Sequence, residues 1–262
     1  MGKDKDNAWN LVGHSSQESH ASEDQFVARS KLQKYFEETP LPKDELMMSL
    51  GLYMRGSVLV KILALEEIYK RILKIPGYIM EFGTRWGQNL ILFENFRAIY
   101  EPFNKTRKII GFDTFGGYEG HSEKDKKSEI FSANSYQTTK DYPNYLRNLI
   151  SLHERNNVLG HLTSIHEIIE GDASVTVPYY LRDNPETLLA LCYFDMGLYE
   201  PTKHALMAIK PHLMPGSIIL LDELTWSEAP GEAIAFKEVF HSSEYIIEKS
   251  TLTPMRSIVT IR

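Results

Sequence analysis

Acidic side chains stand at the ends of several apolar stretches of the sequence. They are Glu81, Asp113, Asp172, Asp195, Asp222 and Glu223. Such charges contribute nothing to the packing of a buried strand, because an ionised carboxyl group is costly to remove from water. In an open α/β sheet the carboxyl ends of the strands meet at one edge, and ligands bind there. We therefore expect these acids to lie along one edge and to bind a ligand.

The segment that begins with Glu81 contains two glycines in the pattern Glu81-x-Gly83-x-x-x-Gly87. Glycines at a turn from a strand to a helix allow the backbone to approach a ligand closely. The spacing differs from the G-x-G-x-x-G of dinucleotide-binding enzymes, since residues 84–86 (Thr-Arg-Trp) stand where a tight pyrophosphate-binding turn would be. This segment is either part of a nucleoside site or an ordinary turn.

Two further acids have positions suited to a nucleoside ligand. Asp113 ends an apolar stretch, where its carboxylate can accept hydrogen bonds from both ribose hydroxyls of a dinucleotide or an adenosyl ligand. Gly171-Asp172 can accept from an adenine amino group. The alternatives are an N-cap of the next segment for Asp113 and a plain turn for Gly171-Asp172.

Asp195, Asp222 and Glu223 form a different set. Three carboxylates at the tips of adjacent strands repel one another and raise one another's pKa values. A hard divalent cation relieves that repulsion, and oxygen ligands suit Mg²⁺, Mn²⁺ or Ca²⁺ rather than zinc. The alternative is that these carboxylates are solvated or cap helices.

The elements that must position these acids follow from the apolar pattern. Strands are expected over 78–83, 108–113, 164–170, 187–195, 216–221, 245–248 and 257–261. Helices are expected over 57–73, after a shorter one from 46, and over 88–100, 145–157, 201–213 and 231–240. Strands that alternate with helices indicate a mostly parallel, Rossmann-like α/β sheet with helices on both faces. The polar, glycine-rich stretch 116–141 is expected to be a long loop.

Size and charge limit the classes of function. The 262 residues fit one α/β domain, which we place at 46–262, preceded by a polar segment at 1–45. That segment is either a disordered arm or a flap that covers the substrate site. A formal charge of −6 gives no field that attracts nucleic acid or an anionic membrane, so a small molecule is the expected partner.

The lone cysteine, Cys192, cannot form an internal disulfide and lies in an apolar run, where it is expected in the core. No apolar stretch approaches the roughly 18 residues of a membrane span, and the charged start at residues 1–6 differs from a signal peptide. A cytoplasmic location is therefore expected. The apolar stretch 47–53 packs either on the core or on a second subunit, which leaves a homodimer open.

Five segments carry a resemblance to a known family. They are PGYIMEFGTRWG at 76–87, GFDTFGG at 111–117, FDMGLYEPT at 194–202, PGSIILLDEL at 215–224 and APGEAIAFKEVF at 229–240. In their order and spacing the chain, from about residue 45 to 262, resembles the TylF-like (macrocin O-methyltransferase) family of class I S-adenosylmethionine-dependent sugar methyltransferases. The resemblance implies the class I methyltransferase fold, with a final antiparallel strand, and favours S-adenosylmethionine over NAD as the cofactor.

The resemblance also implies roles for individual residues. Those implied to bind the cofactor are Glu81, Phe82, Gly83, Thr84, Gly87, Asp113, Thr114, Gly171, Asp172, Ala173 and Asp195. Among them, Glu81, Asp113 and Asp172 would lie at the methionine, ribose and adenine parts of the cofactor respectively. Asp195, Asp222 and Glu223 would bind a Mg²⁺ ion that also chelates the acceptor, and Asp195 is the candidate catalytic residue.

Two positions depart from the family pattern and bear on the reaction. Gly197 stands where the family usually has an acid, a candidate general base, and Glu223 stands where it commonly has aspartate. The expected activity is Mg²⁺-dependent O-methylation of a hydroxyl group on a sugar or a natural-product intermediate. N-methylation of an amine, and an inactive homologue that still binds the cofactor, are alternatives. A nicotinamide oxidoreductase is disfavoured because the G-x-G-x-x-G turn is absent from the sequence.

Overall fold

The computed structural model describes residues 22–118, 122–125, 136–157 and 165–262. The chain divides into two compact units, Met1–Leu59 and Val60–Arg262. Residues 1–21 lie outside the described part of the chain, so the arm and the flap both remain predictions for the N-terminal segment. The predicted domain start at residue 46 also stays a prediction.

The described part of the first unit is helical. It contains α2 (Glu23–Glu37), α3 (Lys43–Met48) and the short 3₁₀ helix η1 (Leu50–Leu52). Ser22 caps α2: its Oγ accepts from the backbone N of Gln25 (3.3 Å), and the Gln25 side chain accepts from the backbone N of Ser22 (2.9 Å). None of these three helices buries a residue. The apolar pattern therefore gives no signal for α2, and the sequence does not predict this helix.

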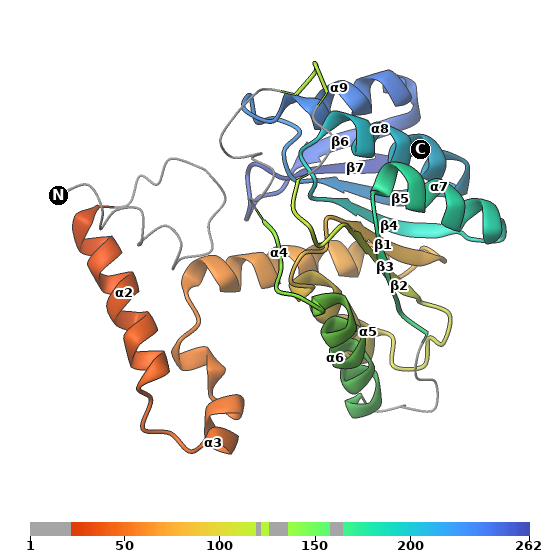
Figure 1. Ribbon diagram of the computed structural model, residues 1–262. Coiled ribbons are helices and arrows are strands. Elements are labelled where there is room, and N and C mark those ends of the chain that lie inside the picture. Colours follow the sequence, from red (N-terminus) through yellow and green to blue (C-terminus); the bar gives the residue numbers. More distant parts are fainter. Residues whose placement is uncertain (1–21, 119–121, 126–135, 158–164) are drawn as a thin grey trace. The chain divides into compact units, whose positions relative to one another are not determined.

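A single sheet forms the centre of the second unit (Figure 1). Its strands are β1 (Tyr78–Phe82), β2 (Ile109–Asp113), β3 (Glu167–Glu170), β4 (Leu189–Phe194), β5 (Leu213–Leu221), β6 (Tyr245–Lys249) and β7 (Ser257–Ile261). The order across the sheet is β3-β2-β1-β4-β5-β7-β6. Strands β1 to β5 run parallel, whereas β7 is antiparallel to both of its neighbours. The mostly parallel α/β sheet with a final antiparallel strand is confirmed.

Helices cover both faces of this sheet. They are α4 (Gly56–Arg71), α5 (Gln88–Tyr100), α6 (Tyr142–Asn156), α7 (Ala173–Asp183), α8 (Tyr199–Ile209) and α9 (Pro230–Val239), with 3₁₀ helices η3 (Lys210–His212) and η4 (Ser242–Glu244). Side chains of α4, α5 and α6 share one hydrophobic cluster, and those of α7, α8 and α9 share another. Figure 1 shows α5 and α6 on one side of the sheet and α7, α8 and α9 on the other. No helix in the described residues is long and apolar enough to cross a membrane.

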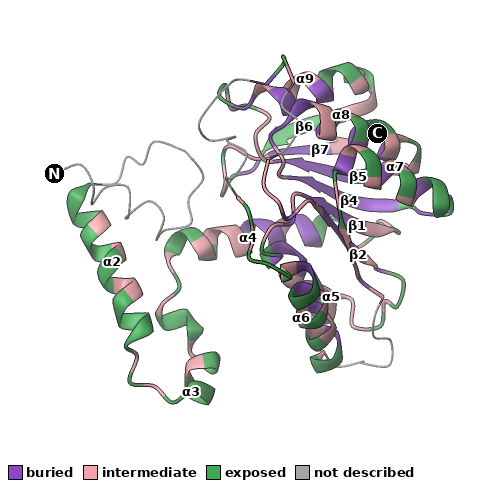
Figure 2. Cartoon of the chain, in the orientation of Figure 1, coloured by how far each residue is buried: buried purple, intermediate pink, exposed green. Residues whose placement is uncertain are grey.

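The central strands are buried on both faces, as their unbroken apolar runs predict. Every residue of β4 is buried, and Figure 2 shows the buried residues concentrated in the sheet. Successive residues of β1 face opposite clusters: Ile79 belongs to one and Met80 to the other. Cys192 is fully buried in β4 without a disulfide, which confirms its predicted place in the core.

Most predicted elements agree with the structure to within a few residues, but α7 is not predicted from the sequence. Residues 175–177 (Val-Thr-Val) are β-branched, and Pro178 lacks a backbone N–H, so both features disfavour a helix. The helix forms because Asp172 caps its first turn and because Val177 and Leu181 are buried in the core. Strand β5 also begins earlier than expected, at Leu213 rather than at residue 216.

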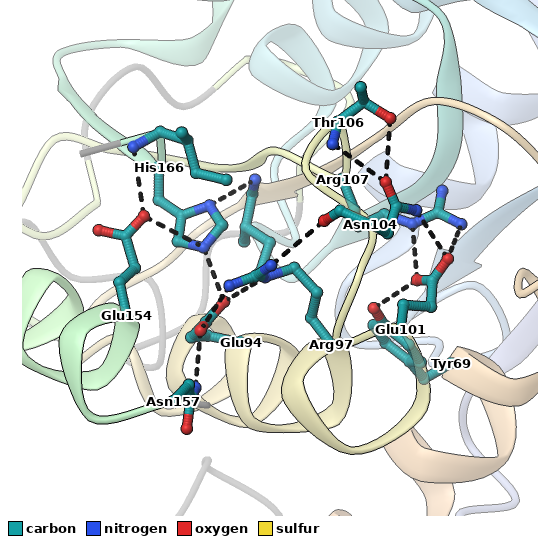
Figure 3. A network of polar contacts seen from close by, with 12 residues as sticks. Tyr69, Glu94, Arg97, Glu101, Asn104, Thr106, Arg107, Glu154, Asn157 and His166 are labelled. Carbon is teal, nitrogen blue, oxygen red and sulfur yellow. Dashed lines mark hydrogen bonds and ion pairs between the residues drawn. The ribbon is translucent and has the colours of Figure 1, made fainter. Parts of the chain in front are cut away.

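Buried polar groups hold the connections at the amino ends of the strands (Figure 3). Arg107 is 1% exposed, donates to three backbone carbonyls between residues 72 and 77 (2.6–3.0 Å), and pairs with Glu101 (3.0 Å). His166, just before β3, lies with its Nε2 2.8 Å from a carboxylate oxygen of Glu94. These groups support the sheet at the edge opposite to the acids that end the strands.

Candidate active site

Glu81 lies near the carboxyl end of β1 and is fully buried. Its Oε1 accepts from Nδ2 of Asn89 in α5 (2.5 Å), whereas its Oε2 has no hydrogen-bond partner among the described residues. Burial raises the pKa of Glu81 to about 8, although the hydrogen bond from Asn89 lowers it. The charges of Asp195 and Asp113 also raise this pKa, and that of Lys61 lowers it. A buried carboxyl group with a vacant acceptor atom can bind an ammonium group of a ligand.

The two glycines after β1 are required by the protein's own packing. Gly83 has a φ of +90°, and a Cβ there would lie 2.1 Å from the backbone O of Asp195. Gly87 has a φ of +73°, and a Cβ there would lie 2.3 Å from Cδ1 of Leu146. Thr84, between them, is buried, and its Oγ1 has no partner among the described residues. The turn thus brings β1 against the residue that follows β4, and its contact with a cofactor stays a prediction.

Asp113, the last residue of β2, connects two turns. Its Oδ2 accepts from the backbone N of Arg85 (2.7 Å), and its Oδ1 accepts from the backbone N of Phe115 (2.6 Å). The next residue, Thr114, donates its hydroxyl to the backbone O of Gly117 (2.9 Å). Burial raises the pKa of Asp113. Each carboxylate oxygen has a further lone pair, so Asp113 can cap its own loop and still accept from ribose hydroxyls.

The residues expected at the adenine lie at the end of β3. Gly171, with a φ of +135°, donates its N–H to the backbone O of Asp113 (2.9 Å), which places the end of β3 beside that of β2. Asp172 is exposed, and its Oδ1 caps α7 by accepting from the backbone N of Ser174 (2.8 Å). Ala173 is buried in the first turn of α7. The capping role is the one that the structure shows, and contact with adenine stays a prediction.

The structure brings Asp195, Asp222 and Glu223 together, and we call them the acidic trio. One carboxylate oxygen of each lies within 4.8 Å of the others. Asp195 follows β4, where its backbone N donates to the O of the buried Phe82 in β1 (2.9 Å), and the other two acids follow β5. The hydroxyl of Tyr193 lies 3.5 Å from Asp195 and 3.3 Å from Asp222. Burial, and then the charge of Asp222, raise the pKa of Asp195 to about 6.

Two residues that no pattern in the sequence indicates also contact the acidic trio. Arg256, in the turn before β7, donates from Nε to Asp222. Glu232, in the first turn of α9, is fully buried, and its Oε1 accepts from the backbone N of Glu223 (3.0 Å). In the sequence, Glu232 is similar to the many acids that begin helices. Arg256 stands in a segment without a pattern, so no spacing signal identifies either residue.

The oxygen atoms at this edge of the sheet suit a hard divalent cation. All the candidate ligands are carboxylates, which Mg²⁺ prefers. The Oε2 atoms of Glu223 and Glu232 are buried and have no hydrogen-bond partner among the described residues. Burial, and then the charge of Glu232, raise the pKa of Glu223 well above its ordinary value. A cation at the acidic trio would relieve the repulsion among its three carboxylates, so the trio fits such an ion.

The loop between β2 and α6 contributes aromatic side chains beside the acidic trio. Tyr118 packs against Leu198, and burial followed by the charge of Glu223 raises its pKa. The ring of Tyr118 lies edge-on to that of Tyr136, with 5.2 Å between centroids, and the guanidinium of Arg85 lies 4.5 Å from the centroid of Tyr136. Aromatic and charged groups of this loop and of the turn after β1 thus neighbour the acids.

The fold and the site together define a class of protein. A sheet in this order, with one antiparallel strand and acids at its carboxyl edge, is that of a Rossmann-like class I methyltransferase. The crystal structure of the calicheamicin methyltransferase CalS11 is 36% identical to this chain, covers 92% of it and 94% of its own length, and has a TM-score of 0.87. The chain belongs to the family of O-methyltransferases that includes CalS11, and it is a methyltransferase.

Other comparisons agree on the fold. The apo structure of CalS11, described as a TDP-rhamnose 3'-O-methyltransferase in calicheamicin biosynthesis, is also 36% identical, with a TM-score of 0.80 over 92% of this chain and 96% of that one. The structure of the O-methyltransferase NovP is 15% identical and has a TM-score of 0.57; the match covers 78% of this chain and 79% of NovP. At this identity it supports the fold alone. No family model and no curated protein sequence matches the chain.

Proposed function

We propose that the protein transfers the methyl group of S-adenosylmethionine to a hydroxyl group of a sugar or natural-product intermediate, with the help of Mg²⁺ or another hard divalent cation. Its similarity to CalS11, a TDP-rhamnose 3'-O-methyltransferase, supports a sugar acceptor. Within the sugar methyltransferases we assign it to the macrocin O-methyltransferase type, because the five sequence segments between residues 76 and 240 resemble that type.

The position of Asp195 is the observation that carries the proposal. Its charge raises the pKa of the buried Glu81 on β1, and its carboxylate lies within 4.8 Å of those of Asp222 and Glu223. Asp195 therefore connects an acid suited to the cofactor with a set of acids suited to a cation. A methyltransferase that activates its acceptor next to the methyl donor needs such an arrangement.

The ends of β1, β2 and β3 suit the successive parts of S-adenosylmethionine. The Oε2 of Glu81 can accept from the α-ammonium group of the cofactor. The remaining lone pairs of Asp113 can accept from the ribose hydroxyls, and the exposed Asp172 can accept from the adenine amino group. A hydrogen bond to a charged group contributes about 1.5–3 kcal/mol, so removal of the Glu81 carboxyl group should weaken cofactor binding.

Transfer to a hydroxyl group requires that the acceptor is aligned with the methyl group and loses a proton. When bound, a divalent cation lowers the pKa of a coordinated hydroxyl group and orients it. Asp195, with a pKa of about 6, is mostly ionised at neutral pH and can accept the proton as a general base. Gly197, at a φ of +67°, has no side chain that shares this role.

Activity with and without a chelator tests the proposal. The full-length protein is incubated with S-adenosylmethionine and a panel of nucleotide-linked sugars, with EDTA or with added Mg²⁺, and methylated products are measured by mass spectrometry. Asp195→Ala should lower kcat by ~10²–10⁴-fold, while its affinity for S-adenosylhomocysteine in calorimetry stays near wild type. Full wild-type activity in EDTA would contradict the cation, and full activity of the variant would contradict the role of Asp195.

The glycine at position 197 favours a second candidate, N-methylation of an amine acceptor. An amine needs less help with proton removal than a hydroxyl group, because it is neutral above its own pKa. The same panel therefore includes aminosugars. Methylation of these in EDTA, where hydroxyl acceptors do not react, would favour the second candidate.

A further inference from the structure

We propose that Arg85 binds a phosphate group of the acceptor, and that the acceptor is therefore a sugar linked to a diphosphate rather than a neutral glycoside. The inference rests on the proposed function, since it takes a sugar as the acceptor. Arg85 stands in the turn after β1, between the glycines at 83 and 87. It is not among the site residues expected from the sequence, so it would add a residue that decides which acceptors bind.

Arg85 has a backbone conformation that residues other than glycine rarely adopt. Its φ is +48°, in the left-handed region. Asp113 at the end of β2 holds it there, because its Oδ2 accepts from the backbone N of Arg85 (2.7 Å). Such conformations persist where the surrounding structure fixes them, and they are frequent at ligand sites. The side chain of Arg85 therefore starts from a fixed position beside the acid expected at the cofactor ribose.

The guanidinium of Arg85 has two aromatic neighbours. It lies 4.5 Å from the ring centroid of Tyr136 and 5.9 Å from that of Trp86. An aromatic ring attracts a cation through its face, but it does not replace the oxygen acceptors that the five N–H groups of an arginine require. The Nε of Arg85 is buried and has no hydrogen-bond partner among the described residues. A buried donor of this kind indicates an anionic ligand, and the forked guanidinium suits a phosphate group.

Tyr118 connects this guanidinium with the acidic trio. Its ring lies edge-on to that of Tyr136, with 5.2 Å between centroids. Burial, and then the charge of Glu223, raise the pKa of Tyr118, whereas the charge of Arg85 lowers it. The hydroxyl group of Tyr118 is therefore near enough to feel both the trio and Arg85. An acceptor whose sugar hydroxyl binds at the trio would have its phosphate groups on the side of Arg85.

The α-carboxylate of S-adenosylmethionine is the other anion that binds at this edge of the sheet in the proposed function. Lys61 of α4 suits it better than Arg85 does. Burial raises the pKa values of Glu81 and Asp195, and the charge of Lys61 lowers both, so Lys61 acts at the end of the site expected to hold the methionine part. Burial also raises the pKa of Asp113, and there it is Arg85 that lowers it. Arg85 is thus left for an anion of the acceptor.

Calorimetry with nucleoside diphosphates tests the inference. Uridine and thymidine diphosphate, and uncharged uridine and thymidine, are titrated into full-length wild type, Arg85→Gln and the control Arg182→Gln. The solutions contain S-adenosylhomocysteine, and they contain EDTA so that no cation binds the diphosphate. Arg182 also lies 4.5 Å from a tyrosine ring centroid, that of Tyr179, but it is exposed and pairs with Asp183.

We expect wild type to bind at least one diphosphate more tightly than the corresponding nucleoside. Arg85→Gln should bind that diphosphate about 10–100-fold more weakly, because it loses hydrogen bonds between charged groups. The control should bind it with wild-type affinity. Arg85→Lys, which keeps the charge and loses the forked geometry, should bind with intermediate affinity. The thermal unfolding midpoint and the affinity for S-adenosylhomocysteine should stay at their wild-type values in Arg85→Gln.

The other outcomes overturn the inference. They are equal diphosphate affinity in wild type and Arg85→Gln, and no preference of wild type for a diphosphate over its nucleoside. Weaker binding of S-adenosylhomocysteine alone in Arg85→Gln would assign Arg85 to the cofactor carboxylate instead. The proposed function fails in a separate measurement, in which wild type with Mg²⁺ methylates neither nucleotide-linked sugars nor neutral glycosides.

Discussion

The Oε2 atoms of Glu81, Glu223 and Glu232 are buried at the carboxyl edge of the sheet without a hydrogen-bond partner among the described residues. An unsatisfied buried polar atom costs about 1–3 kcal/mol. Such a cost at a single residue is tolerable, but its repetition at one edge indicates a role other than stability. At the scale of the residue, the site therefore consists of buried carboxyl groups that can bind positively charged ligands.

Glu81→Gln should change the pH dependence of stability. The pKa of Glu81 is about 8 in the folded protein, above the ordinary 4.5 that applies when the chain is unfolded. Between these values the folded state holds a proton that the unfolded state has released. Wild type therefore loses stability as the pH rises, by up to about 1.4 kcal/mol per pH unit. Glutamine does not titrate. The free energy of unfolding of the variant should therefore rise relative to that of wild type between about pH 5 and pH 8, and the difference should stay constant above pH 8.

Urea unfolding of the ligand-free proteins at several pH values measures this effect. The same variant should bind S-adenosylhomocysteine about 10-fold more weakly or worse, because it loses a hydrogen bond to a charged group. A stability difference that does not vary with pH would show that the pKa of Glu81 is not raised. Unchanged affinity for the cofactor product would remove Glu81 from the cofactor site.

At the scale of elements, Arg107 holds the loop before β2, and its removal should destabilise the fold. Arg107→Met removes the cation that pairs with the mostly buried Glu101, and it removes one donor from each of three backbone carbonyls. Breaking a buried ion pair in this way costs about 3–5 kcal/mol. Arg182→Met is the control, because Arg182 and Asp183 form an exposed pair with 65% and 63% of their side chains accessible. Urea unfolding should show a large loss for the first variant only, and equal midpoints would contradict the role of Arg107.

The sequence predicts those elements whose apolar pattern matches their packing. The range expected for α5, 88–100, is the range observed, and so is that of β7, 257–261. Helix α7 is not predicted, because Pro178 and its β-branched neighbours disfavour a helix locally. Burial of Val177 and Leu181 in the core stabilises it. Tertiary contacts outweigh local preference there, and a single sequence does not contain them.

The candidate site likewise contains residues that the sequence predicts and residues that it does not. Asp195, Asp222 and Glu223 are predictable because each follows an apolar strand and parallel strands end at the same edge. Glu232 and Arg256 reach that edge from α9 and from the turn before β7. Their places depend on how a helix and an antiparallel strand pack on the sheet, which spacing along the chain does not reveal.

At the scale of the whole sheet, the two parts of the site meet where β1 pairs with β4. The candidate cofactor residues lie mostly at the ends of β1, β2 and β3, and the acidic trio lies at the ends of β4 and β5. From β1 the sheet continues through β2 to β3 on one side, and through β4 to β5 on the other side. Doubly wound sheets bind ligands where the strand order reverses in this way, which here is between β1 and β4. The backbone N of Asp195 donates to the O of Phe82 (2.9 Å), and Gly83 lies against the O of Asp195.

Gly83→Ala should therefore impair both parts of the site together. Its Cβ would lie 2.1 Å from the backbone O of Asp195, and a φ of +90° is strained for alanine, so the ends of β1 and β4 must move apart. A displacement of about 1 Å in an active site can lower the rate by ~10²-fold. We expect such a loss of kcat, with weaker binding of both S-adenosylhomocysteine and Mn²⁺, in a protein that circular dichroism shows to be folded.

The pattern of losses separates this variant from the others. Glu81→Gln should weaken binding of S-adenosylhomocysteine alone, and Asp222→Asn should weaken binding of Mn²⁺ alone, because each acts on one part of the site. Gly51→Ala serves as the control, since a Cβ on Gly51 meets no atom within 4 Å. If Gly83→Ala weakened only one of the two ligands, the parts would be independent, and Asp195 could not be the residue that connects methyl donor and acceptor.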